Sequence, residues 1–457
     1  MNQATLLQPT PGLRAVVERL VAAGHPAYAV GGAVRDSLCG QRVGDWDVAT
    51  AAHPEVVQSL FPITFPIGVE HGTVGVRAEG ETIEVTTFRT DVATDGRHAE
   101  VRFGATLEED LERRDFTINA IAWDLESDSV IDPFGGRGDL DAGVLRAVGE
   151  PDRRFPEDYL RVLRAFRFVV RFGLEIEPET ERALERHAAG VVRLSGERVR
   201  DELLKTLAEC RSVSSVLGMW RQHGVLALLF PELAVCFGVE QNVYHAYVVG
   251  VHTLLVADHV HPRRPFLRVV ALCHDLGKPM AREVHPETGD WTFPQHELPS
   301  ARLTRQALRR LKFSRREVTR ASHLVRVHMD LPPPDVSDAA IRRWIRRVGE
   351  EHLWDLYRLQ LADWRGNRKR DERPPTPIVD LYHRARRVLK EQTALRVEDL
   401  AIDGNDLTAM GLAPGPEFGQ TLEWLLEQVI EQPALNTRET LVEMVRDRTG
   451  FQPVNHT

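Results

Sequence analysis

The chain has 457 residues, with 58 basic and 67 acidic side chains, so its formal net charge is −9 with histidine neutral. Hydrophobic residues make up 42% and charged residues 27%, which excludes a fibrous or largely disordered protein. This length predicts about three domains. No apolar run approaches the roughly 20 residues of a membrane-spanning helix, and the start lacks a basic then apolar leader. We expect a cytoplasmic protein without a membrane partner.

The four cysteines are Cys39, Cys210, Cys236 and Cys273, and none forms a CxxC pair. This argues against a disulfide framework or a thiolate zinc site, and we expect buried small hydrophobic residues instead. Nucleic-acid binding by a net negative chain would depend on local basic patches and metal ions.

The first 150 residues have the mixed pattern of an α+β domain. A helix is predicted over 13–23. Strand-like runs follow at 28–30, 45–48, 73–77 and 82–87, then an apolar run at 116–123 and a glycine-rich turn at 134–139. We expect a mixed sheet with helices.

Helical patterns dominate after residue 150. Pro156, followed by Glu157 and Asp158, predicts the start of a helix that continues to Phe168. Proline is tolerated in a first turn, and acidic side chains are favoured at the positive end of the helix dipole. We divide the chain into segments 1–150, 151–240, 241–372 and 373–457, with the last boundary at Arg373-Pro374-Pro375.

A first candidate site lies at the start of the chain. Gly31-Gly32 leaves a strand and enters a helix, where backbone without Cβ can approach a phosphate, and Arg35 adds positive charge. Asp45 and Asp47 are at i and i+2 of a predicted strand, so their carboxylates would share one face. Two such oxygen ligands suit Mg²⁺ with nucleotide phosphates. Glu84 is a candidate third carboxylate.

These motifs resemble those of a known family. GGAVRDSLCG at 31–40 with DWDVAT at 45–50 is similar to the opening motif of the bacterial-type (class II) tRNA nucleotidyltransferase and poly(A) polymerase family, in the DNA polymerase beta superfamily. RRDFTINAIA at 113–122, DPFGG at 132–136 and EDYLRVLRAFRF at 157–168 follow in the family's order. The resemblance implies a polymerase-beta-like head followed by an all-α neck, HD and tail region.

The 157–168 segment predicts a reader of nucleobases. Arg161, Arg164 and Arg167 fall three apart and drift over only about 120° of a helix surface. A carboxylate accepts hydrogen bonds and a guanidinium donates them, so Asp158 with Arg161 would fit cytosine and adenine and reject guanine and uracil. The resemblance implies these roles, with Arg114, Arg164 and Arg167 also contacting the nucleotide.

The function that the resemblance implies is template-independent addition of CCA to the 3′ end of tRNA from CTP and ATP, with Mg²⁺. Expected partners are tRNA, through its 3′ end and acceptor arm, and the two nucleotides. Alternatives are an A-adding or CC-adding partial enzyme, a poly(A) polymerase, and an HD phosphohydrolase with an RNA-binding head. The segment 89–110 is a loop of almost full length, which disfavours CC-only addition. The sequence does not indicate an oligomeric state.

A second candidate site lies in the helical region. His274-Asp275, within LRVVALCHDLGKP, resembles the signature of the HD phosphohydrolase superfamily. Imidazole and carboxylate together suit Mn²⁺, Fe, Ni²⁺ or Zn²⁺, so a transition metal is expected there. The resemblance implies the ligands His252, His274, Asp275 and Asp363, with His296 and His328 as the extra histidines of sites that hold two metals.

Basic residues concentrate in two later stretches. Such runs form either a solvated face or a contact to the phosphate backbone of the tRNA acceptor arm. The residues are Arg302, Arg305, Arg309, Arg310, Lys312, Arg315, Arg316 and Arg320, continued by Arg342, Arg343, Arg346 and Arg347.

Overall fold

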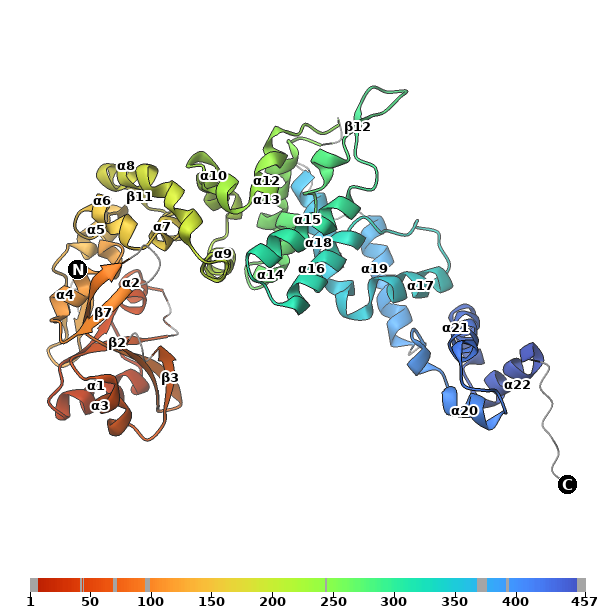
Figure 1. The fold of residues 1–457 in the computed structure, drawn as a ribbon, viewed down its shortest axis with the longest axis horizontal. Helices are drawn as coiled ribbons and strands as arrows, with labels where there is room; N and C mark the ends of the chain where they lie inside the picture. The colour runs from red at the N-terminus through yellow and green to blue at the C-terminus, as the bar shows by residue number, and fades with distance from the viewer. Residues whose placement is uncertain are drawn as a thin grey trace. The chain divides into compact units, whose positions relative to one another are not determined.

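The computed structural model describes residues 7–41, 43, 45–68, 72–94, 99–242, 245–367, 376–391 and 394–449. The chain forms two compact units, Met1–Ala234 with Arg310–Phe313, and Val235–Arg309 with Ser314–Thr457 (Figure 1). Within the described ranges, no helix combines the length and apolar character needed to cross a membrane. The predicted boundary at Arg373-Pro374-Pro375 lies outside them, and the four-segment division stays a prediction.

A seven-stranded mixed sheet organises the start of the first unit, as expected for the head. The strand order is β3-β4-β5-β2-β1-β8-β9, in which only β2 and β5 are parallel neighbours. The strands are β1 (Ala27–Val30), β2 (Asp47–Thr50), β3 (Thr64–Gly68), β4 (Thr73–Ala78), β5 (Glu81–Thr87), β8 (Ala122–Asp124) and β9 (Ser129–Ile131).

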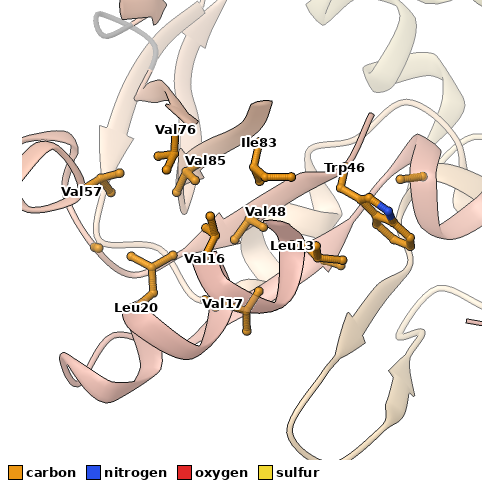
Figure 2. Close-up of a cluster of buried hydrophobic side chains, with 14 of the residues drawn as sticks. Leu13, Val16, Val17, Leu20, Trp46, Val48, Val57, Val76, Ile83 and Val85 are labelled. Atoms are coloured by element: carbon orange, nitrogen blue, oxygen red, sulfur yellow. The ribbon is translucent and has the colours of Figure 1, made fainter. Parts of the chain in front are cut away.

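Helix α1 (Pro11–Ala22) supplies one side of the head's core. Its apolar residues Leu13, Val16, Val17 and Leu20 recur at helical spacing and are buried against Val48, Val76, Ile83 and Val85 of the sheet (Figure 2). Ile83 and Val85 are at i and i+2 of β5, so both point to this face. Fully burying one such side chain contributes roughly 1.5–3 kcal/mol. This packing holds β2 and β5, which carry the candidate acidic residues, in fixed positions.

Shorter elements and then helices complete the first unit. Figure 1 shows the helices of this unit, some within the head and the rest after it in the chain. They are α2 (Gly32–Leu38), α3 (Pro54–Leu60), α4 (Leu107–Glu112), α5 (Gly136–Ala142), α6 (Pro151–Glu157), α7 (Leu160–Phe172), α8 (Pro178–His187), α9 (Gly196–Glu209), α10 (Val213–Gln222) and α11 (Val225–Leu229).

The second unit is largely helical, as expected for everything after the head. Helix α13 packs against α14 and α18, and α17 packs against α18, α19 and α21. The helices are α13 (Val249–His259), α14 (Pro265–Cys273), α15 (Glu297–Arg310), α16 (Arg315–Val327), α17 (Asp338–Val348), α18 (Glu350–Asn367), α19 (Thr376–Lys390), α20 (Gly404–Ala409), α21 (Pro416–Glu431) and α22 (Arg438–Thr449).

Two predicted elements are wrong in a way that affects the site. The strand predicted at 45–48 begins at Asp47, so Asp45 lies in the preceding loop. The helix predicted from Pro156 is two helices, because Asp158 is extended (φ −154°, ψ 104°) between α6 and α7. The Asp158 carboxylate accepts a hydrogen bond from the Leu160 backbone N–H (3.0 Å), so it stabilises the start of α7 instead of lying within a helix.

Two smaller expectations are also corrected. Cys39 is exposed, whereas the other three cysteines are buried; all four are free thiols. The segment 89–110, expected to be a loop, contains the antiparallel pair β6 (Arg89–Thr94) and β7 (Ala99–Phe103) before α4 begins. Residues 95–98 of this segment lie outside the described ranges.

Candidate nucleotide pocket and metal-binding cluster

A cavity of about 620 Å³ in the first unit gathers most of the predicted site residues. Gly32, Arg35, Asp47, Arg114, Asp158, Arg161, Arg164 and Arg167 all line it, whereas Asp45 is not among its lining residues. Gly31 and Asn119 of the sequence motifs line it too, and the residues that sequence reasoning did not single out are Arg113, Asp115, Leu160, Phe168, Arg171, Arg198, Lys205 and Glu209. The lining is strongly basic and suits an anionic ligand.

The glycine turn forms a tight part of this cavity. Gly31 has φ 73°, a conformation that favours glycine, and donates its N–H to the Ile121 carbonyl (3.3 Å). A Cβ on Gly31 would lie 2.7 Å from Nη1 of Arg114 and 3.9 Å from Oδ2 of Asp47. The missing side chain therefore lets the backbone approach a cation and a carboxylate that face the same space.

Three carboxylates lie close together where β2 begins, in the middle of the sheet. Asp47 pairs with Glu84 in the register between the parallel strands β2 and β5. Burial raises the pKa of Asp47 to about 6; the charges of Glu84 and Asp45 add to this rise, and Arg114 opposes it. Asp45 thus acts on Asp47 although it is exposed and lies before the strand. Hard oxygen donors that repel one another in this way fit a divalent cation.

Arg35 is held in the wall of the pocket by contacts with neighbouring side chains. Its side chain is buried, and its Nε donates to Oδ1 of Asp36 (2.8 Å) while its Nη1 donates to the side chain of Asn119. The guanidinium also lies over the rings of Phe168 and Phe172, 5.0 and 4.6 Å from their centroids. These contacts join α2 to α7, so Arg35 is already held by the protein.

The predicted base-reading pair faces the pocket from the break between α6 and α7. Asp158 Oδ2 accepts a hydrogen bond from Nη2 of Arg198 (2.7 Å). Arg161 donates through Nη1 to the Glu157 carboxylate (2.5 Å) and the Arg154 carbonyl (2.6 Å), and through Nη2 to the Arg113 carbonyl (2.9 Å). The two side chains are therefore each held by neighbours, and the Arg161 backbone N–H donates to the Asp158 carbonyl (3.1 Å).

The next two arginines of α7 form ion pairs with buried carboxylates. Arg164 Nε lies 2.6 Å from Oδ2 of Asp115, and Arg167 Nε lies 2.6 Å from Oε1 of Glu202. Burial alone would raise the pKa of Asp115, but Arg164 and a hydrogen bond from Asn119 lower it to about 2. These pairs fix α7 against the RRDF segment and α9 beside the cavity.

Arg198 and Lys205 are the cationic lining residues that lie farthest along the sequence from the motifs. Both belong to α9, which packs against α7. A usable signal was present, since Arg198, Glu202, Lys205 and Glu209 recur at i, i+4, i+7 and i+11 and form one polar stripe on the helix.

The second unit brings the histidines and aspartates of the HD-like motif together. His252 on α13 lies 3.0 Å from Asp363 on α18, measured from Nε2 to Oδ1, and 3.5 Å from Oδ2 of Asp275. His274 Nε2 lies 3.2 Å from the same Asp275 oxygen. On the other side, Asp275 Oδ1 lies 3.2 Å from His296 Nε2 and 3.9 Å from His328 Nε2. Two buried triads therefore share Asp275.

Backbone contacts orient the imidazoles of this cluster. The Nδ1 atoms of His274, His296 and His328 lie 2.7–2.9 Å from the carbonyl oxygens of the residues three positions earlier. A carbonyl only accepts, so each Nδ1 carries a proton and each neutral ring directs its Nε2 lone pair inward. The Nε2 atoms of His296 and His328 are 3.3 Å apart. Two lone pairs at this distance require a proton or a cation between them.

Burial and neighbouring charges shift the pKa values of the histidines in this cluster. Asp275 forms an ion pair with Lys278 (2.8 Å). Burial would lower the pKa of His274, but the Asp275 carboxylate raises it above its ordinary value, while burial lowers the pKa of His328 to about 4. Imidazole nitrogens around a central carboxylate form a donor set that suits a transition metal.

The predicted basic stretch is not continuous. Its first run divides between α15 and α16. Its second run, on α17, is largely paired with acids: Arg343 and Arg346 with Glu427 (2.9 and 3.0 Å), and Arg347 with Asp330 (2.7 Å). Part of the stretch nonetheless borders a cavity of about 1050 Å³ in the second unit. Its basic lining residues are Arg315, Arg316, Arg320, His323, Arg346, Arg347 and His352.

Three family models match the chain. Residues 27–146 match the Poly A polymerase head domain, and residues 173–237 match the "Probable RNA and SrmB-binding site of polymerase A". Residues 283–445 match tRNA nucleotidyltransferase domain 2. These three regions together cover most of the head and much of the helical remainder.

Relatives match along almost the whole chain. The chain is 32% identical to the CCA-adding enzyme of Geobacillus stearothermophilus over 443 residues, which is 96% of this chain and 97% of that protein. The CCA-adding enzyme of Latilactobacillus sakei is also 32% identical, over 94% of this chain and 96% of its own. The crystal structure of the Bacillus stearothermophilus CCA-adding enzyme in complex with CTP is 31% identical, covering 95% of this chain and 97% of that one, with a TM-score of 0.70.

Proposed function

Because the chain belongs to the family of CCA-adding enzymes, we propose that it adds C, C and A to the 3′ end of tRNA from CTP and ATP without a nucleic-acid template. The observation that carries this proposal is the single cavity in which the glycine turn, Asp47, Asp158 and Arg161 face the same space. The relative of 31% identity was solved with CTP, which supports the nucleotide assignment. Such a reaction would take place in the cytoplasm, where tRNA is processed and used.

The acidic group at the start of β2 fits Mg²⁺. Asp47 and Asp45 are the residues that would hold it, with Glu84 beside Asp47 in the register of the sheet. The mutual repulsion that contributes to the raised pKa of Asp47 is what a bound cation would relieve. When bound, Mg²⁺ would neutralise phosphate charge and favour ionisation of the attacking hydroxyl.

The chain's own residues would bind and orient the triphosphate. The turn at Gly31 brings the backbone close to the Arg114 guanidinium, and Arg114 and Lys205 supply positive charge for the phosphates from the same cavity. The 3′ oxygen of the RNA would attack the α-phosphorus in line, forming one phosphodiester bond as pyrophosphate leaves.

Asp158 and Arg161 would select the base. A carboxylate has about four acceptor positions, so Asp158 can keep its bond to Arg198 and still accept the exocyclic amino group of cytosine or adenine. Arg161 retains N–H groups beyond its recorded bonds, which can donate to the ring nitrogen. Guanine and uracil would place a carbonyl oxygen against the carboxylate, which repels it.

The basic cavity of the second unit supports a contact with the tRNA backbone. Arg315 and Arg316 form no ion pair within the described part of the chain, so their charges are available to phosphates. Such contacts would make tRNA affinity fall as salt rises, because phosphate binding releases counterions.

The decisive experiment is extension of three tRNA transcripts that end before CCA, after C and after CC, with CTP, ATP or both. We expect completion of all three; extension of only the CC-ending transcript would indicate an A-adding enzyme instead. The double variant Asp45→Ala with Asp47→Ala should lose at least 1000-fold in rate while its melting temperature stays near that of the wild type. The control, Glu108→Ala with Glu126→Ala, removes two exposed acids of the same unit and should keep full activity.

A second activity is favoured by the histidine cluster. Because the inward lone pairs of His296 and His328 need a cation or a proton between them, we propose that the two triads bind transition-metal ions. His252, His274, Asp275 and Asp363 would hold one ion, and Asp275 with His296 and His328 a second. When bound, such ions would activate water against a phosphoester, as in HD phosphohydrolases.

Metal content of the purified full-length protein tests this proposal directly. We expect nearly two Mn, Fe, Ni or Zn ions per chain after reconstitution, and about one in His252→Ala and in His296→Ala. His261→Ala, which removes an exposed histidine of the same unit, should retain both ions. Equal metal content in the wild type and in both cluster variants would refute the site.

A further inference from the structure

A third cavity, of about 500 Å³, lies between α18 and α19 in the second unit. It is separate from the histidine cluster and from the larger basic cavity, with which it shares no lining residue. Three aromatic and three basic side chains line it: Trp354, Tyr357, Arg358, Tyr382, His383 and Arg386. Nothing in the proposed nucleotidyl transfer uses these residues.

Helix periodicity places the six residues together. Trp354, Tyr357 and Arg358 are at i, i+3 and i+4 of α18 and therefore share one face. Residues 382, 383 and 386 are at i, i+1 and i+4 of α19, which packs against α18. The cavity thus combines two helix faces that each carry aromatic and basic groups.

The aromatic side chains form a rigid surface. The rings of Tyr357 and Tyr382 are 4.3 Å apart between centroids, and those of Trp354 and Tyr357 are 6.3 Å apart. Tyr382 is only 1% exposed, and its hydroxyl donates to Oε1 of Gln360 (3.0 Å). Gln360 in turn donates to the His328 carbonyl (3.0 Å), so these two hydrogen bonds fix the position of the Tyr382 ring. Trp354 and Tyr357 remain half-buried and accessible from the cavity.

The rim of the cavity is positively charged. Arg386 and His383 are exposed, and neither forms an ion pair with any residue that the structure describes. Arg358 is 40% exposed, donates to the Trp354 carbonyl (2.7 Å) and lies 3.4 Å from Asp355. A cationic ligand for an aromatic cage would be repelled here, and an uncharged peptide would leave the rim unused. A flat ring that carries a phosphate satisfies both parts.

We propose that this cavity binds one nucleotide of the tRNA, with its base stacked on Tyr357 and Trp354 and its phosphate held by Arg386 and Arg358. This rests on the proposed function, since it assumes a tRNA substrate. The volume lies at the lower end of the range for small-molecule sites and accommodates a single nucleotide. Aromatic stacking is tolerant of base identity, so the contact would not depend on which base the tRNA presents.

The test compares tRNA affinity of full-length variants at one fixed salt concentration. Tyr357→Leu and Arg386→Gln should each weaken binding of a tRNA transcript about fivefold to tenfold, with an unchanged KM for CTP. The matched variants Tyr357→Phe and Arg386→Lys, which keep the ring and the charge, should bind like the wild type. Arg386 is exposed, so its variants test the proposal even if a change at Tyr357 lowers the melting temperature.

The outcomes separate this proposal from the proposed function. If the wild type extends tRNA but Tyr357→Leu and Arg386→Gln bind it normally, the cavity proposal is overturned and the enzyme assignment stands. If the wild type extends no transcript, the enzyme assignment fails on its own. Equilibrium dialysis with AMP covers a free-nucleotide ligand: AMP binding that Arg386→Gln abolishes, together with unaltered tRNA affinity, would replace the tRNA nucleotide with a free one and overturn the proposal.

Discussion

In the proposed nucleotide pocket, neighbouring donors hold the carboxylate of Asp158, the predicted base selector. Asp158 lies in a break between two helices, where its Oδ2 accepts from Arg198 and its Oδ1 accepts from the Leu160 N–H. Both donors restrict its rotation, so its remaining acceptor positions point in fixed directions. We therefore expect Arg198 to act as a positioning residue for the proposed base reader.

Arg198→Ala should therefore reduce the discrimination of CTP and ATP against UTP and GTP by about tenfold, because a loosely held carboxylate also tolerates a carbonyl beside it. This discrimination is measured as the ratio of kcat/KM for CTP and ATP to kcat/KM for UTP and GTP. Asp158→Ala should lose the discrimination completely and gives the lower limit of the ratio. Arg182→Ala removes an arginine that is 59% exposed in the same unit and should change nothing. A preserved ratio in Arg198→Ala would show that Asp158 needs no support.

An ion pair between Arg164 and Asp115 ties helix α7 to the head. The Asp115 carboxylate, which is 7% exposed, accepts hydrogen bonds from Arg164 and Asn119. Its pKa of about 2 lies below the ordinary value of 3.8, so the ionised form is favoured in the folded protein. Its contribution to stability is present above pH 4 and is lost as the pH falls toward 2.

Asp115→Asn, which keeps the shape, should lower the free energy of unfolding by about 2 kcal/mol at pH 6. The difference from the wild type should narrow steadily between pH 4 and pH 2, because the wild-type carboxyl then gains a proton. Urea unfolding followed by circular dichroism at several pH values measures it. A constant difference over this range would contradict the assignment of the pKa shift to Asp115.

The two compact units do not follow a simple division of the chain. After entering the second unit the chain returns to the first for Arg310–Phe313, where Arg310 pairs with Glu232 (2.7 Å). Gly196, at the start of α9, faces this returning segment: a Cβ there would lie 2.3 Å from the Arg310 carbonyl oxygen. The absence of a side chain at one position thus permits the segment to join the first unit.

Gly196→Ala should destabilise the first unit by about 1–3 kcal/mol, since the segment or the helix must shift. A decrease in melting temperature of several degrees is expected for a unit of this size. Gly218→Ala provides the control, because no atom lies within 4 Å of its Cβ position in α10 and alanine is the better helix former. If the two variants melt alike, the close approach at Gly196 has no energetic consequence.

The family and the fold class, a mixed head followed by a helical region, were predictable from the sequence alone. Local rules were enough to interpret the glycine pair, the carboxylates two residues apart and the arginines three apart. The apolar patterns predicted the mixed head and the helical remainder in the same way. The order of the motifs indicated the family. Local rules could not place the start of β2 at Asp47 or the break at Asp158, because both depend on contacts made elsewhere in the fold. Only the tertiary structure brought Arg198 and Lys205 to the pocket, joined two triads through Asp275, and paired the second basic stretch with acids of α21 and Asp330. Those pairings join residues many positions apart, and their energies depend on burial and distance, which no sequence pattern specifies.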